Sequence, residues 1–193
     1  MLRITLSLEI GAVKNKRMKN KGFTIIELLM ALCLASVVVG LIFSLFTVSY
    51  WSYKSIRNNL ELQFQSQYIL NYMADRIMNS NSISLVRVEG SIYSMTYVRN
   101  AGTEYPINKI SFKFGNKSDE NYVFHIVNGD IQYTTGEKDA NPAAELGKFV
   151  DSMYISLLKD GSFRDANAVV IKIVMKKDGL MYEAFQTVHM RNN

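Results

Sequence analysis

Hydrophobic and polar positions divide the chain into three parts. A segment rich in basic residues ends at Gly22, an apolar run follows as far as Trp51, and shorter hydrophobic periods fill the remainder. From Leu28 to Tyr50 the run has no charged residue and no proline. A helix of about 20 such residues crosses the hydrocarbon core of a bilayer. The pattern therefore predicts one membrane span.

Beyond the span, the pattern predicts that the same helix continues as an amphipathic segment. Apolar residues recur at helical spacing in one broad stripe, formed by Ile56, Leu60, Phe64, Leu70 and Ile77. Residues 41–89 contain no proline. The helix is expected to end at the polar residues 79–82, because their side chains compete for backbone hydrogen bonds. One helix is therefore predicted over residues 23–78, with its stripe packed on the rest of the protein.

The C-terminal part, residues 83–193, has the pattern of an antiparallel sheet. Asn128-Gly129 and Asp178-Gly179 are typical of tight hairpin turns. Strands are predicted over residues 92–98, 109–114, 122–127, 131–133, 149–158, 168–175 and 180–189, and a polar loop with Pro142 over 135–146. A sheet of this size needs one face covered. The predicted fold class is α+β, with the long N-terminal helix packed on an antiparallel β-sheet.

Charge sets the orientation of the span. Five basic residues lie shortly before it, whereas only Lys54 and Arg57 closely follow it, so the N-terminus is expected in the cytoplasm and the C-terminal domain outside. Residues 1–22 have a net charge of +5, which equals that of the whole chain, so residues 23–193 sum to zero. The basic character of the chain therefore gives no support to nucleic-acid binding.

The residues at the mouth of the span form an ordered motif. A secretory signal places its small cleavage-site residue after the apolar core, whereas here Gly22 precedes the run. Cutting after Gly22 would remove the charges and keep the helix. Together with Phe23 and Glu27, this arrangement resembles the N-terminal region of the type IV pilin superfamily. The resemblance implies cleavage between Gly22 and Phe23 by prepilin peptidase, N-methylation of Phe23, and a role for the Glu27 carboxylate in assembly.

The resemblance further implies a structural subunit of a type IV filament machine and not an enzyme. Major pilins often have a proline midway along the membrane half, and this chain has none there. Its closing segment, residues 185–192, looks like the minor pilin branch that includes the J pseudopilin of type II secretion. The function expected is that of a minor pilin or pseudopilin in a pilus, type II secretion or competence system. The alternatives are a single-span membrane-anchored binding or adhesion protein outside any filament, and a bitopic membrane enzyme or sensor.

The implied partners are other pilins or pseudopilins, prepilin peptidase, the inner-membrane assembly platform and membrane lipid, with nucleic acid only through a competence role. The expected location is the cytoplasmic membrane as a single-pass protein, and then a filament at the cell surface or in the periplasm. Four parts are expected: a basic leader over 1–22, a span over 23–51, an amphipathic and terminating segment over 52–82, and a β-rich domain over 83–193. Within the leader, Met18 is the expected true start, with residues 1–17 an over-extended gene prediction or a dispensable extension.

Within the span, Ser36, Gly40 and Ser44 recur at four-residue steps on one helix face. Small residues at this spacing let helix backbones approach closely, so they predict helix packing in a filament core, although scattered small residues in an apolar helix are the simpler alternative.

No cofactor and no metal site are predicted. Cys33 is the single cysteine and lies in the apolar run, which excludes an intramolecular disulfide. His125 and His189 lie in predicted strands without a second ligand at metal-binding spacing and are expected to be structural or merely polar surface residues. Residues 116–121 supply oxygen ligands without the spacing of an EF-hand loop, so calcium is the weaker alternative there. Neither a glycine-rich phosphate loop nor a nucleophile elbow occurs.

Overall fold

A single long helix, α1, runs from Ile25 to Met78 and is followed by ten strands. The computed structural model describes residues 22–88, 90–142 and 144–190, so the predicted leader and its start at Met18 lie almost wholly outside the described residues. Contacts divide the chain into two units, one ending at Val48 and one beginning at Ser49. The strands are β1 (Ser82–Val88), β2 (Ser91–Ile92), β3 (Tyr105–Ile107), β4 (Lys109–Lys113), β5 (Asn121–Val127), β6 (Asp130–Gly136), β7 (Ala144–Gly147), β8 (Val150–Leu157), β9 (Ala168–Lys177) and β10 (Leu180–His189).

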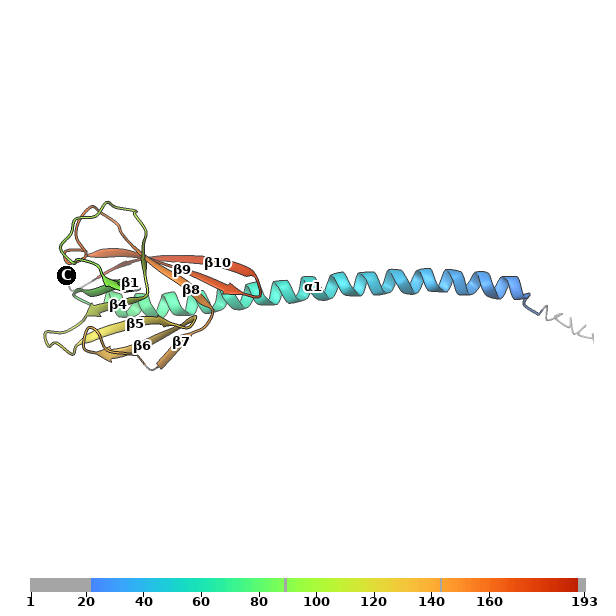
Figure 1. Cartoon of the computed structure of the whole chain (residues 1–193), viewed down its shortest axis with the longest axis horizontal. Coiled ribbons are helices and arrows are strands. Elements are labelled where there is room, and N and C mark those ends of the chain that lie inside the picture. The colour runs from blue at the N-terminus through green and yellow to red at the C-terminus, as the bar shows by residue number, and fades with distance from the viewer. Residues whose placement is uncertain (1–21, 89, 143, 191–193) are drawn as a thin grey trace, which may run out of the picture. The chain divides into compact units, whose positions relative to one another are not determined.

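In the second unit the strands form two antiparallel sheets against the helix (Figure 1). A six-stranded sheet has the order β2-β1-β4-β5-β6-β7, and a four-stranded sheet has the order β10-β9-β8-β3. The core contains fully buried residues from the helix and both sheets, among them Ile69, Phe124 and Ile173. The predicted α+β class, a long helix on antiparallel β-structure, is confirmed, with two sheets where the sequence suggested one.

The helix packs through a face different from the predicted stripe. Leu70 and Ile77 are buried as expected, but Ile56, Leu60 and Phe64 are exposed. The buried residues of the helix are Asn58, Leu62, Ser66, Ile69, Leu70, Met73, Ala74 and Ile77. The prediction was wrong for the exposed three because helical periodicity alone does not show which of two apolar faces the sheets cover. The true contact face includes Asn58 and Ser66, so it is less apolar than the stripe that was chosen.

Both predicted hairpins are confirmed. Asn128 and Gly129 have φ of 54° and 85°, and Asp178 and Gly179 have φ of 48° and 80°. Two consecutive residues at positive φ form a type I′ turn, whose twist matches that of the flanking strands. The predicted strands at 109–114 and 149–158 are likewise confirmed by β4 and β8.

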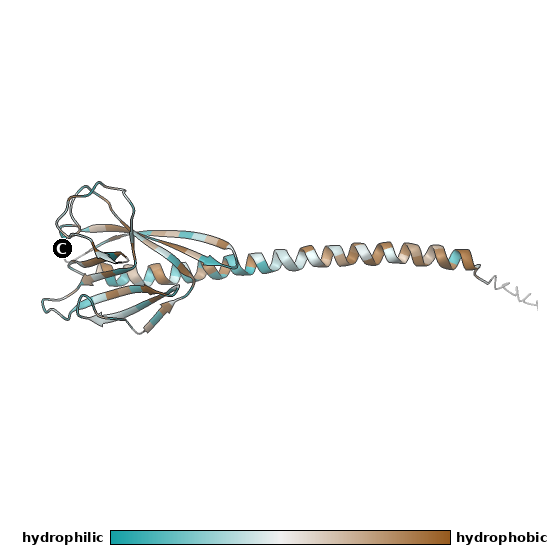
Figure 2. Ribbon diagram, in the orientation of Figure 1, coloured by the Kyte–Doolittle hydropathy of each residue, from teal (hydrophilic) through white to brown (hydrophobic). Residues whose placement is uncertain are grey.

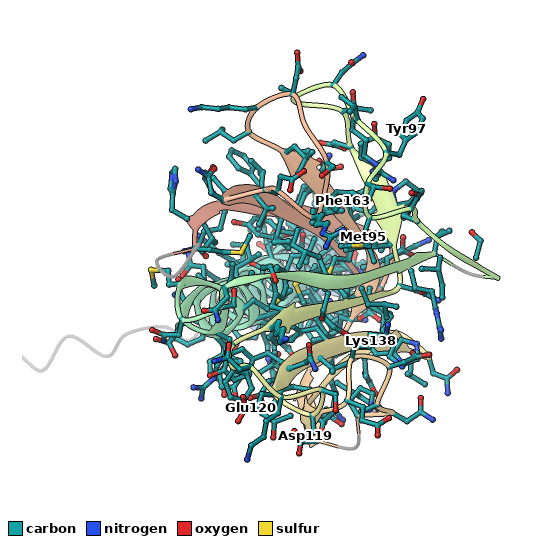
Figure 3. All side chains as sticks on the ribbon, turned by 90° about the vertical axis from the view of Figure 1, so that its left-hand side faces the viewer. Met95, Tyr97, Asp119, Glu120, Lys138 and Phe163 are labelled. Atoms are coloured by element: carbon teal, nitrogen blue, oxygen red, sulfur yellow. The ribbon has the colours of Figure 1, made fainter. Side chains whose placement is uncertain are left out.

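The strand predicted over residues 92–98 was wrong. Only Ser91 and Ile92 pair, and the chain then forms a loop that lies against residues 158–167 through an isolated bridge between Arg99 and Gly161. Figure 3 shows Tyr97 pointing outward from this loop, with Met95 and Phe163 further in. The buried Arg99 guanidinium lies 4.1 Å from the Phe163 ring centroid, and it donates hydrogen bonds to the carbonyl oxygens of Tyr97 and Ser94. The aromatic residues of the 92–98 segment, which suggested a strand, thus lie around the Arg99 guanidinium instead.

Three strands were missed by the sequence analysis, namely β1, β3 and β7. Strand β7 lies largely within the polar loop predicted over residues 135–146. The first part of that loop forms a strap over the six-stranded sheet. The Lys109 side chain is 1 % exposed, and its ammonium donates to Asp139 Oδ1 at 2.8 Å and to the Asp139 carbonyl at 2.9 Å. Arg87 contacts the other carboxylate oxygen at 2.6 Å. The Lys109 hydrogen bond, aided by Arg87, holds the pKa of the Asp139 carboxyl below its usual value.

Candidate processing and assembly site

The Gly22–Phe23 peptide lies in an exposed, non-helical segment directly before α1. Phe23 is 84 % exposed. A Cβ added to Gly22 would meet no atom within 4 Å, and the backbone there is not in the left-handed region. The fold of the described chain therefore places no requirement on glycine at this position.

Helix α1 begins with a reciprocal cap between Thr24 and Glu27. The Thr24 backbone N–H and hydroxyl each donate to Glu27 Oε2 at 2.9 Å, and the Glu27 N–H donates to the Thr24 hydroxyl at 3.3 Å. This is a capping box, in which a threonine at the N-cap and a glutamate three residues later satisfy backbone donors that the first helical turn leaves unpaired. The sequence analysis missed it, although the Thr24-x-x-Glu27 spacing is its signature.

The described part of the first unit is mostly an apolar helix, and it has no protein partner among the described residues. Figure 2 shows this part of α1 as hydrophobic over nearly its whole length. Within the described residues, α1 is the one helix long and apolar enough to cross a membrane, and its most apolar stretch has no buried part. Such a surface is stable in lipid or against other apolar helices, and not in water.

These observations place a glycine, an aromatic residue and a capped carboxylate at the start of an apolar helix. Residues 17–43 match the prokaryotic N-terminal methylation motif. The methylation motif covers both Gly22–Phe23 and Glu27, and it continues well into the apolar helix. Comparison with curated proteins and with solved structures gave no match.

The methylation motif is that of type IV pilin-like N-termini, and it implies processing by prepilin peptidase and, in general, assembly with other pilins. Proteins with this motif are structural and not catalytic. The motif and the apolar helix together indicate membrane anchoring before assembly. The match ends at residue 43 and does not extend over the β-domain.

In the part of the helix that follows Glu27, small residues such as Ser36 and Gly40 lie among the bulky apolar side chains. A Cβ on Gly40 would meet no atom within 4 Å, so nothing in the described chain requires glycine there. Glycine in a helix interior costs about 1 kcal/mol relative to alanine. Ser36 donates its hydroxyl to the Cys33 carbonyl at 2.7 Å, which satisfies the donor within its own helix. This side of the helix is thus compatible with apolar surroundings and with a closely packed neighbour.

The other candidate residues do not assemble into a site. Among the described residues, no group of three or more His, Cys, Asp or Glu side chains is placed to hold a metal ion. In the 116–121 loop, Glu120 accepts a hydrogen bond from the Lys117 N–H, and the Asn121 amide donates to two carbonyls. His125 lies in β5 beside Lys109. Burial, with the nearby Lys109 and Arg87 charges, lowers its pKa.

Proposed function

We propose that the chain is a minor pilin or pseudopilin, a structural subunit of a pilus, type II secretion or competence filament. Prepilin peptidase cleaves between Gly22 and Phe23, Phe23 becomes N-methylated, and the helix then packs with those of other subunits. The observation that supports this most is the exposed Gly22–Phe23 peptide directly before a capped, membrane-length helix that matches the methylation motif.

Cleavage at this peptide would leave the Thr24–Glu27 cap intact and create a new amine. The backbone N–H of Thr24 belongs to the Phe23–Thr24 peptide, so it remains a donor after cleavage. The backbone nitrogen of Phe23 would become an ammonium at the mouth of the helix. Both hydrogen bonds to the Glu27 side chain use Oε2, and no other described residue donates to Oε1. The second oxygen can therefore accept a bond from another subunit.

Glu27 would assist assembly through this ammonium. A charged side chain costs roughly 2.5 to 3.5 kcal/mol at the centre of a membrane helix and less near its end. The helix macrodipole stabilises the carboxylate by about 0.3 to 1 kcal/mol, which is too little to offset this cost by itself. Two unit charges about 4 Å apart attract by roughly 4 kcal/mol at an effective dielectric of 20, before desolvation is subtracted. A Phe23 ammonium on a neighbouring subunit can thus compensate the Glu27 carboxylate and set the axial register.

A minor and not a major role is supported by the uninterrupted helix. The chain has two prolines, Pro106 and Pro142, and both lie in the β-domain. Helix α1 accordingly runs for 54 residues without a proline kink. Ser36, Gly40 and Ser44 would form the face on which neighbouring helices pack in the filament core. The domain limits follow from this assignment: a leader over 1–22, a filament helix over 23–51, its continuation over 52–82, and a β-domain over 83–193.

Quantification of subunits in sheared filaments tests the proposal. We expect the chain to be present well below the amount of the principal subunit, and we expect its deletion to lower filament number without changing filament diameter. If the chain makes up most of the filament mass, it is the major subunit. A chain that stays in the membrane with its leader uncut, and that co-purifies with no pilin-like subunit, would instead be a single-span anchored binding protein.

A further inference from the structure

The two sheets have four edge strands in the described part of the chain, and three of them are poor templates for pairing. Strand β2 has two residues, β7 has four, and β3 has three with Pro106 at its centre. Short edge strands and prolines are the usual protection against edge-to-edge association. Strand β10 has ten residues, all paired with β9 in continuous register, and contains no proline, lysine or bulge.

The hydrogen bonds of β9 show which backbone groups of β10 face outward. Lys176, which pairs with Met181, donates its N–H to Phe149 on the side away from β10. Met190 donates its N–H inward to Asn167. Because the inward and outward groups alternate along an antiparallel strand, every second residue points outward. The free edge therefore presents the N–H and C=O groups of Met181, Glu183, Phe185, Thr187 and His189.

The side chains of β10 do not prevent another strand from pairing with its free edge. Met181 is 60 % exposed and Phe185 is 74 % exposed on the outer face of the sheet. The only carboxylate of the strand, on Glu183, lies 3.0 Å from Lys172 Nζ on the neighbouring strand, so it is held toward the sheet and away from the edge. Figure 1 shows β10 at the border of the four-stranded sheet.

We propose that β10 binds an extended segment of a different filament subunit, which adds a fifth strand to the four-stranded sheet. This inference rests on the proposed function, because it names the surface that a partner subunit engages. Backbone hydrogen bonds to the five outward residues would supply the attraction. The partner segment would have apolar side chains at alternate positions, because these pack across from Met181 and Phe185.

A second copy of this chain does not fit the edge in a symmetric pair. The β9–β10 turn lies beside the first turns of the helix in the domain, where Asn58 donates to Asp178 at 3.1 Å. A symmetric antiparallel pair of β10 strands would place these ends of the two copies at opposite ends of the pair, whereas both chains continue from them into an apolar helix. A symmetric parallel pair would set outward residues of one strand level with outward residues of the other, whereas a parallel ladder needs each outward residue opposite an inward one. The other three edges of a second copy are too short to offer a matching strand.

Proline and alanine substitutions at the same position distinguish the contribution of the backbone N–H to binding from that of the side chain. Phe185→Ala removes the aromatic ring and keeps the outward N–H, whereas Phe185→Pro removes both and leaves the inward ladder with β9 intact. Thr187→Pro and Thr187→Ala form a second matched pair at a less apolar position. Each full-length variant is co-produced with one methylation-motif subunit of the same host at a time and purified in detergent. Thermal unfolding of each purified variant confirms that it is folded.

For the wild type we expect capture of one such subunit, and slower hydrogen exchange at about half of the amides of residues 180–189 in the complex. The proline variants should lower capture about tenfold or more, and the alanine variants by less. Equal capture by wild-type and folded proline variants, with unchanged exchange in β10, would overturn the edge proposal and leave the proposed function standing. Cross-linking of β10 to β10 of a second copy would also overturn it. If the wild type captures no methylation-motif subunit, the proposed function fails, and this inference falls with it.

Discussion

The Glu27 carboxylate and Thr24 bond each other in both directions, with Oε2 accepting from the Thr24 N–H and hydroxyl at 2.9 Å. Glu27 thus has a helix-capping role in addition to the assembly role proposed for it. Glutamine can replace glutamate in a capping box but has no charge. We expect Glu27→Gln and Glu27→Ala to be cleaved and inserted normally but to enter filaments poorly. Glu27→Asp should restore incorporation only in part, because its shorter side chain reaches less far.

Thr24→Ala is the matched control for this prediction. It removes both hydrogen bonds of the Thr24 hydroxyl, at a cost of about 1 kcal/mol of helix stability, and retains the carboxylate and the backbone N–H that donates to it. Incorporation of each variant is measured by pull-down with the neighbouring pilins. If Glu27→Gln assembles like the wild type while Thr24→Ala does not, the cap and not the charge is what assembly requires.

Gly22→Val should leave the precursor uncut in the membrane. Nothing in the described chain limits the size of a side chain at position 22, so a loss of cleavage would reflect the peptidase and not misfolding. Gly40→Val, the same substitution within the span, should be cleaved normally. Immunoblotting of membrane fractions separates precursor from mature chain, and normal cleavage of Gly22→Val would contradict the proposed site.

Substitutions of one buried and one exposed residue in neighbouring turns of α1 test which face of the helix contacts the sheets. Ile69 is fully buried, and Phe64 is 79 % exposed. We expect Ile69→Ala to lower the free energy of unfolding of the β-domain by about 2 to 5 kcal/mol. Phe64→Ala should change it by no more than about 0.5 kcal/mol, as is usual at the surface. Denaturant unfolding of the full chain in detergent measures both, and a larger loss for Phe64→Ala would contradict the observed face.

Asp139→Asn should destabilise the strap over the six-stranded sheet. The variant leaves the buried Lys109 ammonium without its carboxylate, which we expect to cost about 1 to 3 kcal/mol. Because the pKa of Asp139 is lowered from 3.8 by folding, its contribution is present above about pH 4 and is lost as the pH falls through the folded pKa. The unfolding free energy of the variant should therefore fall less steeply in acid than that of the wild type. Glu104→Gln, which alters an exposed pair with Lys172, is the control.

Local patterns predicted the elements whose causes are local. The long helix, its end near Met78 and both type I′ hairpins follow from residue spacing and turn chemistry, and the structure confirms them. The start of the helix at Ile25 also has a local cause, the Thr24–Glu27 cap, which the sequence analysis overlooked.

Features that depend on distant contacts could not be predicted in this way. The covered face of α1 depends on where two sheets meet it, and the apolar row at Ile56, Leu60 and Phe64 gave the wrong choice. The loop around Arg99 has aromatic residues typical of a strand, yet its conformation is fixed by Phe163, which lies 64 residues further along the chain. The lysine at position 109 is buried only because the strap at Asp139 covers it. The candidate processing site was predictable because its motif is contiguous.

Mass spectrometry of the N-terminus of the membrane-inserted chain tests the central claim most directly. The account predicts a chain that begins at Phe23, with one methyl group on its amine, in cells that contain the peptidase, and an uncut chain in cells that lack it. A mature N-terminus within or beyond the apolar run, or a chain that keeps residues 18–22 in the presence of the peptidase, would contradict the account.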